Sequence, residues 1–291
     1  MSFPFKLRFG EPCTTDWYDS QDNIRTSLVA HSCDEHQDLC YEMVKATWAD
    51  EPVCSGDIND DEVERTFIDI LEGRVLPNSM ERIQFTFLIE GLTLVEVSHM
   101  LRHRVACSIH AQCTADRDLR ADSAFIPSSI MNSQWSAEYI QLAEQCKDLY
   151  ARMVDGVDED DAKSDQISLL DARYILPRCT RQFYYFTFNL KDAIAFIHQR
   201  KCTQVQPELD NIIAHQMFEL ICQVVPHVRN VVSMKCDARC FYVKAPDKDN
   251  SRLYAPDKVH KEALKSICRE DMETLYSKTR KEMGVWFNPQ D

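Results

Sequence analysis

The sequence lacks any run that approaches eighteen consecutive apolar residues, about the length that a membrane-spanning helix needs. Its first residues, MSFPFKLRFGEPCTTDW, also lack the apolar stretch of a secretory signal peptide. Internal repeats are missing as well. We therefore expect a soluble, cytoplasmic protein that contacts no membrane.

Positive charge is scarce in this chain. Its 33 Lys and Arg residues stand against 47 Asp and Glu residues, which gives a formal net charge of -14. Proteins that bind nucleic acids usually carry a basic face, so this balance argues against a nucleic-acid partner. A small anionic substrate is still compatible, because a pocket can be locally positive inside an acidic protein.

Cysteine, by contrast, is plentiful at 13 residues, an odd number. Without a secretory signal we expect free thiols rather than a disulfide framework, most of them small core residues. Cys236 and Cys240 follow His227 closely, but their spacing matches no standard zinc motif. We predict no metal site.

The hydrophobic content of 44% is ample for a packed core, and the patterning mixes strand and helix signals. Two stretches rich in β-branched and aromatic residues predict strands, at 83–91 and 182–188. Helical spacing predicts four helices, at 92–104, 136–154, 189–201 and 207–225. Before residue 75 we expect turns and helices, and the acidic segment 155–166 and the tail 244–291 are expected to face solvent.

Two residues are predicted to mark helix starts. Ser136 is a plausible N-cap, because its hydroxyl can accept a hydrogen bond from a first-turn amide. Pro207 suits the first turn of the last helix, where no amide hydrogen is needed.

The stretch LRHRVACSIHAQCTADR, residues 101–117, is unusually basic for this chain. If the preceding helix continues through Arg102, His103 and Arg104, each side chain is turned by about 100° from the next. The three then cannot converge on one group, but they can serve two neighbouring ligands. Arginine suits phosphate or pyrimidine carbonyl groups, so we predict a site for phosphorylated ligands; internal salt bridges are the structural alternative.

The predicted helix at 189–201 places Asn189 and Arg200 on one face. At about 100° per residue, the steps between them end about 20° from three full turns. Leu190, Ala193, Ile194 and Ile197 form an apolar stripe beside this polar pair. Such a pair at the rim of a core suits a ligand site, and a solvated helix edge is the alternative.

Four motifs at their joint spacing resemble the flavin-dependent thymidylate synthases. They are RHR at 102–104, ARYILP at 172–177, NLK at 189–191 and R-x5-Q-x-E at 200–208. The resemblance covers residues 76–226. It implies an α/β protein with a mixed sheet and flanking helices, a single domain over 1–291, and a family-atypical extension from about residue 227.

The resemblance also implies an activity. Members of this family are homotetramers with active sites shared between subunits. They bind FAD, reduce it with NADPH, and transfer the methylene of methylenetetrahydrofolate to C5 of dUMP. Arg200 and Arg102 would then be catalytic. The residues matching flavin positions are His103, Arg104, His110, Asn189, Lys191 and Gln204. The residues matching nucleotide positions are His99, Arg102, Gln112, Cys113, Thr114, Arg117, Arg173 and Arg200.

The chain departs from the family pattern at AQCTADR, residues 111–117. The family usually reads RHR-x2-S-x-N-E-x-S-x-R, and here the glutamate position falls on Ala111 and the final arginine position on Ala115. We predict a variant nucleotide loop in which Arg117 supplies the missing cation. Pairing of Arg117 with a nearby carboxylate is the alternative. Cys113 can be read as a nucleophile, but a hydrogen-bonding thiol is the preferred interpretation.

The sequence is compatible with three functions. The first is the methylation of dUMP to dTMP. The second is a flavin-dependent hydroxymethylase acting on dUMP or dCMP, in which water rather than hydride quenches the methylene intermediate. The third is a relative that binds flavin or nucleotide without catalysis.

Overall fold

The computed structural model describes residues 18–19, 24–33, 36–50, 59–103, 107–120, 122, 124–157, 165–201 and 206–232. These fall into two compact units. Unit 1 combines the chain up to Arg25 with Ile89–Arg102 and Ile109–Tyr185, and unit 2 combines Thr26–Leu88, His103–Ser108 and the chain from Phe186 onward. The extension predicted after residue 227 lies outside the described residues from position 233.

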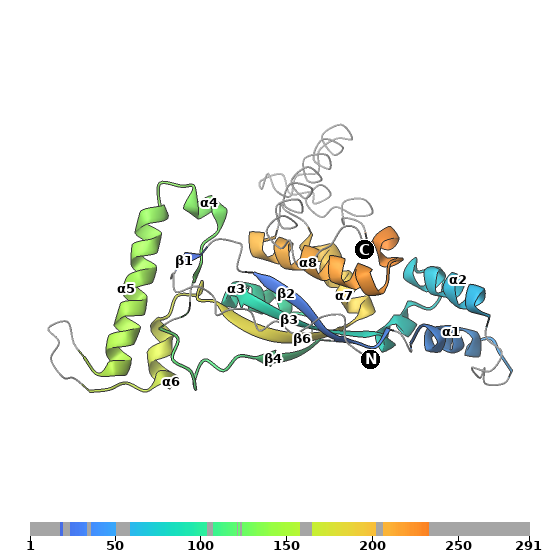
Figure 1. The fold of residues 1–291 in the computed structure, drawn as a ribbon, viewed down its shortest axis with the longest axis horizontal. Helices are drawn as coiled ribbons and strands as arrows, with labels where there is room; N and C mark the ends of the chain where they lie inside the picture. Colours follow the sequence, from blue (N-terminus) through green and yellow to red (C-terminus); the bar gives the residue numbers. More distant parts are fainter. Residues whose placement is uncertain are drawn as a thin grey trace, which may run out of the picture. The chain divides into compact units, whose positions relative to one another are not determined.

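The main sheet has four strands in the order β2-β3-β6-β4 (Figure 1). They are β2 (Arg25–His31), β3 (Gln84–Leu92), β6 (Gln182–Asn189) and β4 (Cys107–Ala111). The segments 83–91 and 182–188 are therefore strands, as predicted. Alternate aromatic side chains make one face of β3 and one face of β6 apolar, and Phe85, Phe87, Phe186 and Phe188 are completely buried.

Strand β2 corrects the prediction that residues before 75 form only turns and helices. Thr26, Ser27 and Leu28 are buried one after another, so the strand shows no alternation of apolar and polar residues. A short strand without this alternation gives no periodic signal. The same region also contains the helices α1 (His36–Ala46) and α2 (Asp60–Leu71).

In unit 2, helices α7 (Leu190–Arg200) and α8 (Glu208–Val224) pack against each other. Helix α7 also contacts strand β6, because the rings of Phe196 and Phe188 lie 5.6 Å apart. In α8 every residue from Leu209 to Cys222 is buried, which makes it a central element of this unit. Short elements complete the unit: the 3-10 helix η4 (Pro77–Arg82) and α9 (Val228–Val231).

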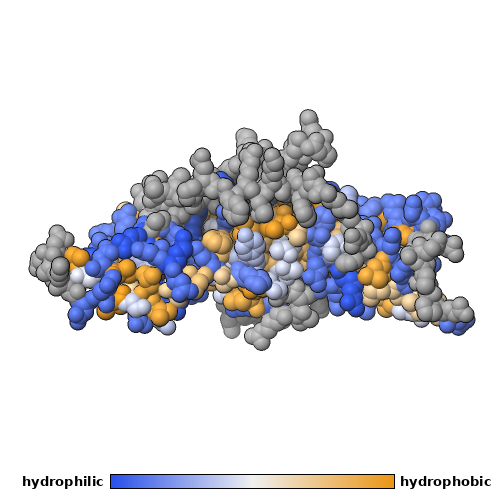
Figure 2. All heavy atoms as spheres, turned by 60° about the horizontal axis from the view of Figure 1, so that its bottom comes forward, coloured by the Kyte–Doolittle hydropathy of each residue, from blue (hydrophilic) through white to orange (hydrophobic). Residues whose placement is uncertain are grey.

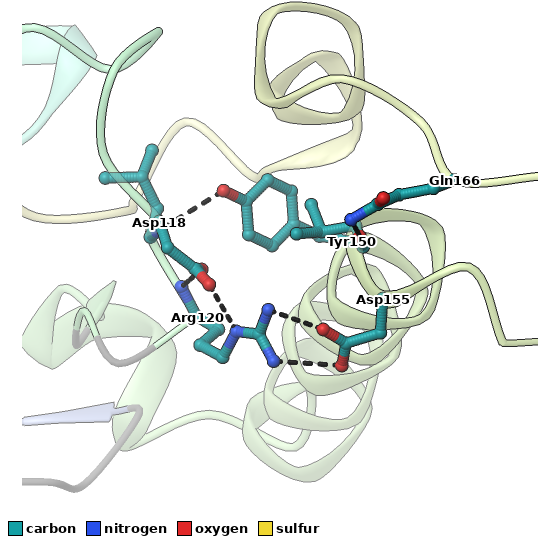
Figure 3. A network of polar contacts seen from close by, with 7 residues as sticks. Asp118, Arg120, Tyr150, Asp155 and Gln166 are labelled. Atoms are coloured by element: carbon teal, nitrogen blue, oxygen red, sulfur yellow. Dashed lines mark hydrogen bonds and ion pairs between the residues drawn. The ribbon is translucent and has the colours of Figure 1, made fainter.

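In unit 1, the long helix α5 (Ser136–Asp155) is fixed at its C-terminal end by a polar network (Figure 3). Arg120 donates two hydrogen bonds to the Asp155 carboxylate, at 2.9 and 2.8 Å, and a third to Asp118 at 2.5 Å. The buried Tyr150 hydroxyl accepts a hydrogen bond from the Leu119 amide at 3.1 Å. The network attaches the loop that follows β4 to α5.

The remaining elements of unit 1 are short. They are α3 (Leu94–Met100), α4 (Ser128–Met131), α6 (Leu169–Ala172), the 3-10 helix η5 (Arg173–Ile175), and the parallel strand pair β1 (Tyr18–Asp19) and β5 (Ala124–Phe125). The α/β class with helices flanking a sheet is confirmed.

Three predicted helix boundaries need correction. Helix α5 begins at Ser136, but its N-cap is Trp135 and no side chain caps it. Pro207 is the N-cap of α8 and lies just before the first turn, where its missing amide hydrogen is equally harmless. Helix α3 is capped at its start by a capping box of Thr93 and Glu96, and it ends at Met100. Because the helix ends before Arg102, the 100° spacing assumed for the basic triplet does not apply.

The described cysteines are free thiols, and Cys33, Cys40, Cys179 and Cys222 are buried, as predicted for core residues. Cys236 and Cys240 lie outside the described residues. Among the residues that are described, no cluster of His, Cys, Asp or Glu could hold a metal ion. No described helix is long and apolar enough to cross a membrane.

Candidate active site

Among the predicted site residues that the structure describes, Arg200 is the most completely buried. It is the last residue of α7 and only 4% exposed. Its Nη1 donates a hydrogen bond to the Gln206 side chain and lies 3.5 Å from Oδ2 of Asp210. The Asn211 amide donates to the Arg200 carbonyl at 2.5 Å. Arg200 is thus held, through its side chain and its backbone, by residues at the start of α8.

His103 lies in the same unit and shares an aromatic neighbour with Arg200. Its ring is 5.2 Å from the Phe196 ring, and the Arg200 guanidinium is 5.9 Å from that ring. Burial lowers the pKa of His103, and the charge of Arg200 lowers it further, while Asp192 acts in the opposite direction. His103 is therefore neutral at pH 7, with one ring nitrogen that donates and one that accepts.

Asn189 and Lys191 occupy the start of α7. Asn189 is buried and caps the helix, because its Oδ1 accepts a hydrogen bond from the Asp192 amide at 2.8 Å. Lys191 forms an ion pair with Glu81 at 2.6 Å, with both side chains more than 40% exposed. Such a surface pair is worth little and is easily exchanged for an anionic ligand. Asn189 and Arg200 are both buried. Because Asn189 is the N-cap and its backbone is extended, the helical spacing that predicted a shared face does not apply to it.

In unit 1, the structure brings together two residues predicted to bind the nucleotide. Arg173 and Thr114 are far apart in the sequence, but Nη1 of Arg173 donates to the Thr114 hydroxyl at 3.1 Å. Nε of the same arginine donates to the Leu170 carbonyl at 3.1 Å, which fixes the plane of the guanidinium. Arg173 is thus oriented toward the variant loop.

Gln112 and Cys113 of this loop both form hydrogen bonds, Gln112 to strand β6 and Cys113 within the loop. The Gln112 amide donates to the Phe183 carbonyl at 3.3 Å, and its side-chain oxygen accepts from the Phe183 amide at 3.2 Å. The Cys113 thiol donates to the Asp116 carboxylate at 3.0 Å. This contact makes Cys113 a hydrogen-bond donor within the loop, and both roles of Cys113 toward a nucleotide stay predictions.

Arg117 forms an ion pair with Asp122, which is the alternative that the sequence left open. The Asp122 side chain is 17% exposed. Burial raises its pKa, and the neighbouring Arg117 lowers it in part. Binding of a phosphate by Arg117 stays a prediction, and it would require the phosphate to compete with Asp122.

Five predicted site residues remain. His99 lies in the last turn of α3, and its carbonyl accepts a hydrogen bond from the Arg102 backbone amide at 3.3 Å. The Arg102 side chain and His110 on β4 are both exposed. Arg104 and Gln204 lie outside the described residues. His99, Arg102 and His110 keep their predicted roles as expectations.

Sequence patterns did not identify Asp210 as a site residue. Gln206 belongs to the R-x5-Q-x-E motif, but Asp210 looks like an ordinary acidic residue in a helix's first turn. The only sequence signal was its position, since it follows a motif that already contains Arg200 and Gln206. Its contact with Arg200 depends on how α7 and α8 pack.

The donor groups in unit 2 suit a flavin. A neutral His103 and the side-chain amide of Asn189 can donate hydrogen bonds to the uncharged acceptors of a flavin ring. Lys191 is a cation that can pair with an anionic phosphate of the cofactor. Unit 1 contributes the arginine and hydroxyl groups expected for a nucleotide. Each unit therefore carries donor groups of the kind predicted for one of the two ligand classes, and the roles of these residues stay predictions.

Comparisons with known proteins agree with these features. A family model described as thymidylate synthase complementing protein matches residues 27–227. The flavin-dependent thymidylate synthase of Nitratidesulfovibrio vulgaris is 28% identical over 185 residues, 63% of this chain and 74% of that protein. The one from Geobacter sulfurreducens is 26% identical over 193 residues, 65% of this chain and 76% of that protein.

Solved structures share the fold. The UMP/dUMP methylase PolB from Streptomyces cacaoi, bound with 5-Br dUMP, matches with a TM-score of 0.58 at 16% identity, over 73% of this chain and 96% of that one. Its complex with 5-Br UMP matches with the same TM-score at 18% identity, over 75% and 96%. Because the family model spans more than half of the sequence, the chain belongs to the thymidylate synthase complementing proteins, the family of the flavin-dependent thymidylate synthases.

Proposed function

We propose that this protein transfers a one-carbon unit from methylenetetrahydrofolate to C5 of dUMP and forms dTMP. Family membership supports the reaction class, and the relatives from Nitratidesulfovibrio vulgaris and Geobacter sulfurreducens carry that activity in their names. The single observation that carries the proposal in this chain is the enclosure of Arg200 by Gln206 and Asp210. A buried, oriented guanidinium next to an aromatic ring is suited to the carbonyl edge of a pyrimidine.

Different residues of the chain would bind different parts of the nucleotide. Arg200 would orient the pyrimidine ring by donating to a carbonyl oxygen, which also favours negative charge that develops on that oxygen during attack from C5. Arg173, held against Thr114 and Leu170, would donate to the nucleotide. Arg102 and His99 would add contacts from the turn after α3, and Arg117 would meet the phosphate.

FAD is the cofactor that we propose, with NADPH as its reductant. His103, Asn189 and Lys191 would hold it from unit 2, and His110, Arg104 and Gln204 complete the predicted set. When bound and reduced, FAD would be the source of the hydride that completes the methyl group. The neutral state of His103 matters here, because a second cation beside Arg200 would repel it and disturb the nucleotide contact.

Homotetramer formation is part of the same proposal. Helix α5 carries an exposed apolar stripe at seven-residue spacing, with Trp135 at 60%, Leu142 at 55% and Leu149 at 36% exposure. Figure 2 shows apolar side chains at the surface of the part of unit 1 that contains α5 and α6. Residues at this spacing lie on one helix face, as helices that pair with other helices require.

One observation favours a second candidate, a hydroxymethylase acting on dUMP or dCMP. The variant loop lacks the family's glutamate, and its Gln112, Cys113 and Arg117 are all engaged in internal contacts. A loop with altered contacts can admit a different base or a water molecule at the reacting carbon.

Mass spectrometry of the product distinguishes these candidates. The purified chain is supplied with FAD, NADPH and methylenetetrahydrofolate, and with either dUMP or dCMP. The proposal predicts a methyl product from dUMP and none from dCMP. A hydroxymethyl product from either nucleotide would establish the second candidate and reject the first.

A further inference from the structure

A buried ion pair joins the ends of helices α7 and α8. Arg200 Nη1 lies 3.5 Å from Asp210 Oδ2, and the two side chains are 5% and 0% exposed. Gln206 accepts a hydrogen bond from the same Nη1, and Asn211 donates to the Arg200 carbonyl at 2.5 Å. Asp210 therefore supplies the one carboxylate among these contacts of Arg200 with residues at the start of α8.

Such a pair is a poor way to gain stability. Removing two charges from water costs much of what their attraction returns, and apolar residues of similar volume often stabilise a core as well. What the pair does provide is direction, because a guanidinium has a rigid planar set of donors. With Nη1 directed at Asp210 and Gln206, the plane and rotation of the group are determined.

The pair also has an electrostatic consequence. The charges of Arg200 and Asp210 cancel, so the pair offers hydrogen-bond donors without a net positive charge. A dianionic phosphate needs an uncompensated cation, whereas a pyrimidine carbonyl is a neutral acceptor. The balanced pair therefore matches the base of a nucleotide better than its phosphate.

We propose that Asp210 is a positioning and specificity-determining residue: it holds the Arg200 guanidinium toward the carbonyl edge of the pyrimidine and keeps it from binding phosphate. This inference rests on the proposed function, because it assumes that Arg200 contacts a pyrimidine nucleotide. It adds a residue that the family motifs of the sequence did not include.

A double-mutant cycle measured on nucleotide binding tests this role. The variants are Asp210→Asn, Arg200→Gln and the two combined, all in the full chain, and calorimetry gives the affinity for dUMP. We expect Asp210→Asn to weaken dUMP binding about tenfold or more when Arg200 is present. In the Arg200→Gln background, Asp210→Asn should alter the affinity for dUMP less than about twofold, because the guanidinium that Asp210 holds is no longer present.

Inorganic phosphate is the second probe. Asp210→Asn leaves the cation at Arg200 uncompensated, so phosphate should compete with dUMP at a several-fold lower concentration than in the parent. Asp210→Glu keeps the charge but displaces the carboxylate, and it should lose less dUMP affinity than Asp210→Asn. If circular dichroism shows that Asp210→Asn is unfolded, Asp210→Glu takes its place in the binding measurements.

Glu219→Gln is the matched control. Glu219 is a buried carboxylate on the same helix, and it accepts hydrogen bonds from Arg229 at 3.2 and 2.8 Å. Breaking that pair disturbs α8 in a similar way without touching Arg200, so dUMP affinity should change less than about twofold. An equal loss in this control would show that Asp210 acts through the stability of α8, and the inference would be rejected.

The outcomes separate the two claims. If the parent binds no dUMP, the proposed function fails before Asp210 is tested. If dUMP binds and Arg200→Gln weakens it, but the effect of Asp210→Asn is the same with and without Arg200, the function stands and the positioning role is rejected. Coupling between Asp210 and Arg200 in the cycle, together with stronger competition by phosphate in Asp210→Asn, supports the inference.

Discussion

At the residue scale, the hydrogen bond between Arg173 and Thr114 makes a testable link between two predicted nucleotide contacts. Thr114→Val keeps the shape of the side chain but removes the hydroxyl that accepts from Nη1. We expect the KM for dUMP to rise about three- to tenfold with kcat little changed, because one hydrogen bond from a charged donor is lost. Thr180→Val is the control, since its hydroxyl donates to the nearby Pro177 carbonyl. Steady-state kinetics that show the same KM for Thr114→Val and the parent would contradict this role.

At the element scale, helix α8 contains a histidine whose burial makes the unit sensitive to acid. His215 is 5% exposed, and burial lowers its pKa to about 3, with Lys201 contributing in the same direction. The unfolded chain binds this proton near pH 6.5 and the folded chain does not, so stability is lost as the pH falls below 6.5. Between pH 7 and pH 4 we expect roughly 3 kcal/mol of unfolding free energy to be lost through this group.

Denaturant unfolding at several pH values checks this expectation. His215→Asn should unfold more easily at pH 7 but lose less stability on acidification than the parent. Parallel pH profiles for His215→Asn and the parent would mean that His215 does not carry the effect.

Also at the element scale, sequence patterns found the elements with strong periodicity and missed those without it. The aromatic strands β3 and β6 and the helices α5, α7 and α8 have regular spacing, whereas β2 buries three consecutive residues and gives no alternation. In the candidate site, the motifs identified Arg200. They could not identify Asp210, because its contact depends on how α7 meets α8. For Arg117 the sequence offered several possible carboxylate partners, and only the packing selects Asp122.

At the scale of the whole molecule, the exposed stripe on α5 predicts self-association. Leu142→Glu places a charge in the middle of the stripe, and its burial against a partner would be costly. We expect multi-angle light scattering to show a tetramer for the parent and smaller species for the variant. The neighbouring exposed Gln141→Glu adds the same charge outside the stripe and should leave the mass unchanged. An unchanged mass for Leu142→Glu would remove α5 from the interface.

The central claim, that this chain methylates dUMP through a nucleotide contact at Arg200, has one most direct test. The parent and Arg200→Ala are each incubated with dUMP, methylenetetrahydrofolate, FAD and NADPH, and dTMP formation is followed by mass spectrometry. We expect dTMP from the parent and at least a hundredfold slower formation by the variant, which loses an oriented, charge-assisted contact. Flavin absorbance should be retained in both proteins. No dTMP from the parent, or equal rates for the two proteins, would contradict the account.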